Sequence, residues 1–211
     1  MANNIPITVG ELIEATTINT WARGYLRKTT AKTVNTTTTA TDLLNGEFTL
    51  PAGAMGTTKV VRVTATGDWL SNAGSAKDVP RFQFGLGGTT LLDTGVTGIA
   101  IAGNTAQRSS WRFEWEIQNL GAANSQQAYL TGALTYSAQG TTVSSHYFSG
   151  SDGAVFIDNY GAGQPARVSY DGGHTAAVDT TASCAVTLKV INASNSATYE
   201  TQLLGALLEV I

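Results

Sequence analysis

Two carboxylates on one predicted strand come closest to a catalytic pair in this sequence. Glu114 and Glu116 point to the same side of an extended chain, and glycoside hydrolases use pairs of acids for catalysis. The rings of Trp111 and Trp115 face the opposite side, so they cannot form a sugar platform around these acids. We therefore predict a solvated outer face on which Arg112 or a cross-strand Lys or Arg balances the glutamates.

Other side chains that bind metals or act as nucleophiles are few and scattered. His146 and His174 lie in Gly- and Ser-rich sequence without the spacing of a zinc site. Cys184 is the only cysteine, and its apolar, strand-like surroundings predict a buried small hydrophobe. We predict no catalytic residue, no cofactor and no metal, the alternative being calcium on acidic residues of the glycine-rich stretch (Asp152, Asp158 and Asp171).

The glutamates belong to the clearest amphipathic strand of the chain, residues 109–119. Trp111, Phe113 and Trp115 share one face through the two-residue period of an extended strand. Each of these rings buries roughly 150–250 Å² when it enters a core. Neighbouring strands must therefore supply a complementary apolar face.

Similar strands separated by turn residues recur along the chain at the spacing typical of sandwiches. The stretch 140–173 is rich in Gly, Ser, Asp and Tyr, and we expect long loops there around one short strand. The pattern predicts an all-β, antiparallel two-sheet β-sandwich of the jelly-roll type. Its expected strands are 47–50, 58–66, 80–86, 89–92, 109–119, 128–136, 155–157, 184–192 and 197–211.

The composition limits the kinds of partner that we expect. Charged residues make up 13% of the 211 residues, and the net charge of −3 comes without a large basic cluster. Nucleic acid is therefore not an expected partner. No apolar run reaches the roughly 18–20 residues of a membrane span, and no cationic segment precedes an apolar one at the start. We expect neither membrane insertion nor secretion by a signal peptide.

Residues 1–45 differ from the rest, and we predict that they form an extended N-terminal attachment arm on a body of residues 46–211. The Thr-rich run 29–41 favours extended backbone but has few large side chains to bury. Aromatic anchors and cations around it suit docking on another protein. The predicted partner-binding residues of the arm are Ile13, Trp21, Arg23, Tyr25, Leu26 and Arg27.

The last strand is apolar on both faces, which predicts a homo-oligomer. In a regular strand Leu203, Leu207 and Ile211 share one face, and Leu204 and Leu208 lie on the other. One face can enter the core, but the second needs cover because large exposed apolar patches are uncommon on monomers. We predict that Leu203, Leu207 and Ile211 form the oligomer interface.

The order of strands and turns over residues 45–211 resembles a loose family of tailed-bacteriophage virion proteins. The stretches that carry the similarity are 48–56, 59–67, 81–89, 110–114 and 207–211. Members of this family are jelly-roll or related β-sandwich modules of capsid decorations, head fibres and tail components. The resemblance implies a non-enzymatic virion protein, made in the host cytoplasm, that docks on other virion proteins as a homotrimer. It gives no catalytic residues.

The alternative function is a carbohydrate-binding sandwich that recognises a host receptor from the virion. Aromatic side chains in the glycine-rich stretch could stack on sugars, although they could equally cap the core or an interface. The candidate glycan-binding residues are Tyr147, Tyr160 and Tyr170.

Overall fold

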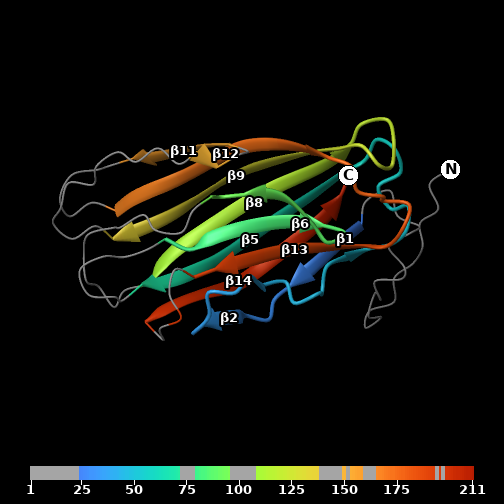
Figure 1. The fold of residues 1–211 in the computed structure, drawn as a ribbon. Coiled ribbons are helices and arrows are strands. Elements are labelled where there is room, and N and C mark those ends of the chain that lie inside the picture. Colours follow the sequence, from blue (N-terminus) through green and yellow to red (C-terminus); the bar gives the residue numbers. More distant parts are fainter. Residues whose placement is uncertain are drawn as a thin grey trace.

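The computed structural model is an all-β sandwich of two antiparallel sheets that pack against each other (Figure 1). Within the part of the chain that it describes there is no helix, and so none that could span a membrane. The described residues are 24–71, 79–95, 108–137, 149–150, 153–158, 165–192, 195 and 198–211.

The larger sheet contains nine strands among the described residues. One strand, β2 (Lys32–Asn35), pairs with β14 beside β1 and so shares the same edge. The others follow the order β1 (Gly24–Lys28), β14 (Tyr199–Val210), β5 (Val60–Ser71), β8 (Ser109–Asn119), β9 (Gln126–Ser137), β12 (Pro165–Ala176), β11 (Gly153–Asp158) and β10 (Ser149–Gly150).

The smaller sheet has five strands in the same described ranges and covers one face of the larger sheet (Figure 1). Its path is β3 (Thr41–Asp42), β13 (Cys184–Ile191), β6 (Arg81–Leu86) and β7 (Thr89–Asp93), and β4 (Thr49–Leu50) also pairs with β13. Because β5 pairs with β14 and β6 with β13, early and late strands lie side by side in both sheets. The sandwich is confirmed, and the finer jelly-roll assignment stays a prediction.

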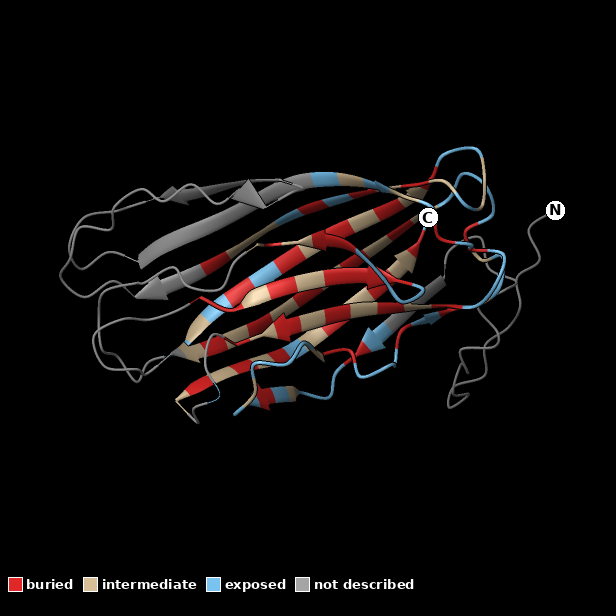
Figure 2. Cartoon of the chain, viewed as in Figure 1, coloured by how far each residue is buried: buried red, intermediate tan, exposed pale blue. Residues whose placement is uncertain are grey.

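Aromatic rings of β8 and β6 fill the space between the sheets. Phe82 lies with its ring centroid 5.2 Å from that of Trp111 and 4.8 Å from that of Phe113. Phe84 lies 5.2 Å from Phe113 and 4.9 Å from Trp115. The predicted strand 109–119 is confirmed to the residue, and buried and more accessible positions alternate along it (Figure 2).

Two glycines let the backbones beside β8 approach these rings. A Cβ on Gly67 would stand 2.0 Å from the Gln202 carbonyl oxygen and 2.3 Å from the Trp111 ring. A Cβ on Gly132 would stand 2.2 Å from the Phe113 ring. At both positions an aromatic ring of β8 occupies the space that a larger side chain would need, at Gly67 on β5 and at Gly132 on β9.

Buried amides and a hydroxyl hold together the turns at one end of the sandwich. Gln126 Nε2 donates to Asn119 Oδ1 at 2.8 Å, and its Oε1 accepts from the Val178 N–H at 2.7 Å. Asn119 Nδ2 donates to the Gly56 carbonyl at 2.7 Å and to Thr180 Oγ1 at 2.9 Å. Because buried polar groups are costly when unpaired, this closed network fixes three turns relative to one another.

Part of the predicted arm belongs to the body. Residues 24–45 form β1, β2 and β3, and the side chains of Leu43 and Leu44 are fully buried. Asp42 accepts from the N–H groups of Leu44 and Leu188, both at 3.1 Å, which ties this segment to β13. Residues 24–45 thus lie in the two sheets, where β1 and β2 cover the edge of β14, and the predicted division into an attachment arm and a body stays a prediction.

Within the stretch 140–173, where long loops were predicted, the structure describes residues 149–150, 153–158 and 165–173, and these are strands. The short strand expected at 155–157 lies within β11, but β12 is a strand of 12 residues that pairs with β9 along its whole length. His174 lies in β12 and not in a loop. Sequence-local reasoning missed β12 because its residues Asp171, Gly172 and Gly173 are typical turn formers, whereas cross-strand pairing holds them extended.

Replacing Gly67 by alanine tests the close approach of β5 to Trp111. We expect Gly67→Ala to lower the free energy of unfolding by at least about 2 kcal/mol, because the new methyl overlaps backbone as well as the ring. Gly205→Ala is the matched control, since its Cβ would meet only the Lys28 carbonyl oxygen at 3.6 Å. Urea unfolding measures both. Equal stability of the two variants would contradict the described packing.

Candidate interaction surface

The face of the large sheet that points away from the small sheet carries paired charges. Arg62 on β5 lies opposite Glu116 on β8, and its Nε and Nη2 atoms are 2.7 and 2.6 Å from Glu116 Oε1. Glu114 is 3.7 Å from Arg62 Nε. The hydrogen bond and charge of Glu116 raise the pKa of the Arg62 guanidinium. The prediction that a cross-strand cation balances the two glutamates is confirmed.

An irregularity in β14 rearranges its leucines. The register with β5 shifts between Leu203 and Gly205, and this exchanges the faces of the residues that follow. Leu203 is fully buried, whereas Leu204 is 50% exposed and Ile211 45% exposed. Leu207 is partly exposed. The expectation that Leu203 shares a face with Leu207 is therefore wrong, because a regular two-residue period does not cross the bulge.

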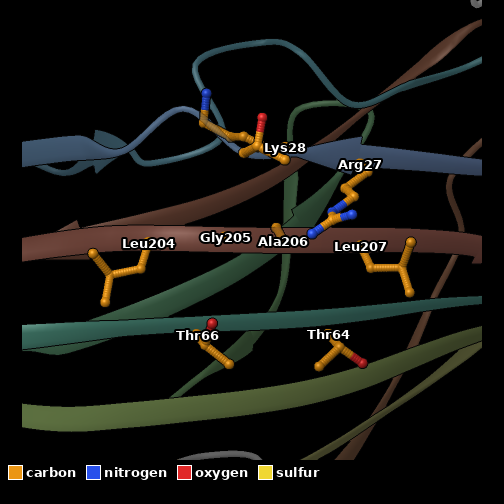
Figure 3. A pocket seen from close by; sticks show the side chains of 9 residues that line it. Arg27, Lys28, Thr64, Thr66, Leu204, Gly205, Ala206 and Leu207 are labelled. Atoms are coloured by element: carbon orange, nitrogen blue, oxygen red, sulfur yellow. The ribbon is translucent and has the colours of Figure 1, made fainter.

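A shallow hollow of about 370 Å³ lies on this outer face between β1, β14 and β5. Arg27 extends from β1 toward β14 beside Leu207, and Thr64 and Thr66 line the hollow from β5 (Figure 3). Its full lining is Arg27, Lys28, Thr29, Thr64, Thr66, Leu204, Gly205, Ala206 and Leu207. The hollow thus combines one guanidinium with hydroxyls and two leucines.

The two cations of β1 have opposite roles. Lys28 is buried, and its ammonium group pairs with Glu47, which ties β1 to the segment before β4. Arg27 is exposed, and among the described residues no carboxylate forms an ion pair with it. Of these two neighbours, Arg27 is the one that can bind an external anion.

The structure describes only some of the residues predicted to bind partners. Tyr25 and Leu26 pair with β14 through their backbones, and Tyr170 pairs with Gly132 in the same way. The fold brings two other predicted residues, Arg27 and Leu207, together at the hollow. Outside the described residues lie Ile13, Trp21, Arg23, Tyr147 and Tyr160.

Sequence reasoning missed three residues of this surface. Leu204 was expected on the face opposite Leu207, yet both line the hollow with Thr64 and Thr66 of β5. One signal was present, because a glycine inside an apolar strand, here Gly205, often marks a bulge. The contribution of the threonines depends on the pairing of β5 with β14 and has no local signal.

Other charged groups form closed pairs at the ends of the strands. Arg108 bridges Asp68 at 2.6 Å and Glu200 at 2.5 Å, which joins the ends of β5, β8 and β14.

Cys184 is buried as predicted, and burial together with the charge of Asp179 raises the pKa of its thiol. Within the described ranges no three His, Cys, Asp or Glu side chains are placed to hold a metal ion.

Comparison with protein-family models and with curated proteins found no match to this chain.

The Asp93 carboxylate makes the free energy of unfolding depend on pH in the acidic range. Burial raises the pKa of this carboxyl, but hydrogen bonds from Arg81 at 2.7 Å, Gln83 at 2.9 Å and the Gly95 N–H at 2.9 Å outweigh burial and lower it. A lowered folded-state pKa contributes stability above the unfolded value of about 3.9. That contribution is lost as the pH falls through the folded-state pKa.

We expect Asp93→Asn to be less stable than the wild type at pH 7, with the difference shrinking as the pH falls below about 4. Urea unfolding across this range measures the difference. Thr131→Ala, a change on the exposed outer face that removes no charge, should give a curve parallel to that of the wild type. A difference between wild type and Asp93→Asn that does not change with pH would contradict the role given to this carboxylate.

Proposed function

We propose that this chain is a non-enzymatic structural protein of a tailed-bacteriophage virion, which decorates or cements the capsid or forms part of a fibre or tail. The protein would be made in the host cytoplasm and incorporated into the virion. The resemblance of residues 45–211 to virion proteins and the two-sheet sandwich both support this proposal.

The observation that carries the proposal is the apolar strip on the outer face of β14. Leu204 and Leu207 lie in the hollow, and Ile211, just after the end of β14, is exposed on the same face beyond Glu209. The neighbouring β5 and β8 present threonines and paired charges on the same face. Exposed leucines beside hydroxyls and mutually paired charges suit close packing against another protein.

The proposed attachment device is the part of the chain that precedes β1. Residues 24–45 belong to the sandwich, so the segment available for docking is residues 1–23. It carries Trp21 as an apolar anchor and Arg23 as a cation that can set the docking register. An ordering cost accompanies such docking, and several copies in an oligomer would offset it.

We propose a homo-oligomer, a trimer by resemblance, in which the strip on β14 is covered. Leu207 and Ile211 remain in the proposed interface, and Leu204 joins them because it is exposed on the same surface. Leu203 leaves it, since a fully buried side chain cannot contact a neighbour in the folded state.

Carbohydrate binding is the second candidate, and one observation favours it. The Tyr129 side chain is 46% exposed on β9, opposite Gly173 on β12, and a Cβ at Gly173 would be 3.2 Å from its ring. A ring lying against a glycine presents an open face on which a sugar can stack. Binding on a glycan array that is lost in Tyr129→Ala would favour this candidate over the structural role.

Incorporation into particles that lack the protein tests the proposed function. We expect the full chain to be incorporated, and the double variant Leu204→Ser, Leu207→Ser to be incorporated at least about tenfold less, since losing interface anchors costs about 2–4 kcal/mol. Leu120→Ser is the control, because Leu120 is 47% exposed in the turn after β8 and lies outside the hollow. Circular dichroism verifies that each variant folds.

Immunogold labelling of the particles locates the incorporated protein. Failure of the wild-type chain to enter any particle, or equal incorporation of the double variant and the wild type, would contradict the proposal.

A further inference from the structure

The hollow on β14 defines the chemistry of what can fill it. Arg27 offers a guanidinium that has no carboxylate partner among the described residues, and Leu204 and Leu207 offer apolar contact. Thr64 and Thr66 add hydroxyls that can pair with backbone groups. A complementary occupant therefore carries a carboxylate next to apolar side chains on a short stretch of chain.

The sequence contains such a stretch in front of β1. Residues 10–15 place Leu12 and Ile13 between Glu11 and Glu14. The other parts of the chain outside the described ranges hold no second stretch in which two acids flank two apolar residues. Asp42, Leu43 and Leu44 are a partial match, but both leucines are already fully buried.

The direction of β1 favours a segment from another copy over the chain's own segment. β1 starts at Gly24 opposite Val210 and reaches Lys28 opposite Ala206, and the hollow lies at the Lys28 end. The preceding residues thus join the sandwich at the far end and would have to double back to reach their own hollow. Residues 16–23 contain no Gly or Pro and four β-branched residues, a composition that favours extended chain over a tight reversal.

We propose that the hollow on β14 binds residues 10–15 of a neighbouring copy of this chain. This inference rests on the homo-oligomer of the proposed function and names the contact that holds it together. One acid of the incoming segment pairs with Arg27, and Leu12 and Ile13 cover Leu204 and Leu207. The second acid points to solvent, because Glu114 stands opposite Thr64 on the β8 side of the hollow.

Disulfide trapping between two full-length variants tests this contact. One variant carries Ile13→Cys, the other carries Leu207→Cys and a size tag, and the buried Cys184 is kept in both. Mixed and mildly oxidised, they should form a covalent heterodimer in about tenfold excess over a control mixture with Thr131→Cys, a site on the exposed outer face away from the hollow. A yield equal to that of the control would overturn the proposal.

A single chain carrying both Ile13→Cys and Leu207→Cys separates the two possible sources of the segment. Disulfides between copies support the proposal, and exclusively intramolecular closure overturns it in favour of the chain's own segment. Virion incorporation without trapping contradicts this inference alone, whereas trapping without incorporation contradicts the proposed function alone.

A charge exchange tests the ion pair separately. Arg27→Glu should raise the dissociation constant of self-association by about tenfold, because it places like charges together. Adding Glu11→Arg and Glu14→Arg to that variant should restore association. Light scattering over a concentration series measures both, and an unchanged dissociation constant in Arg27→Glu, or no recovery in the combined variant, would overturn the pairing.

Discussion

Contact between the aromatic rings of β8 and β6 is the constraint on which the rest of the structure depends. Rings at centroid distances of 4.8–5.2 Å set the separation of the two sheets, and their size requires Gly67 and Gly132 on the strands that flank β8. The same alternation sends Glu114 and Glu116 to the outer face, where Arg62 pairs with them. Core and outer surface are thus two results of one two-residue period.

Features that depend on neighbouring residues could be predicted from the sequence, and features that depend on distant pairing could not. The strand 109–119 and the hairpin of β6 and β7 follow from local alternation and turn residues. Residues 24–45 join the sandwich because β1 and β2 pair with β14 and β3 pairs with β13, strands that lie far along the chain. No local pattern reports such a pairing.

The candidate surface shows the same limit. Arg27 and Leu207 could be named from the sequence, but their meeting depends on the register of β1 with β14. The exchange of Leu203 for Leu204 depends on the bulge before Gly205. Lys28 follows Arg27 directly in the sequence, yet it is buried and pairs with Glu47 within the body. Two consecutive residues of β1 therefore differ in role: one cation stabilises the fold, and the other is free to bind a partner.

Amide hydrogen exchange on the intact protein tests most directly the claim that β8 and its neighbours organise the fold. We expect the amides of β8, which are bonded on both sides by β5 and β9, to exchange slowest and only through global unfolding. β1 and β2 should exchange faster than β8 and slower than the exposed segment at 38–40, because each pairs with β14 on one side. Exchange in β8 as fast as in that segment would contradict the account.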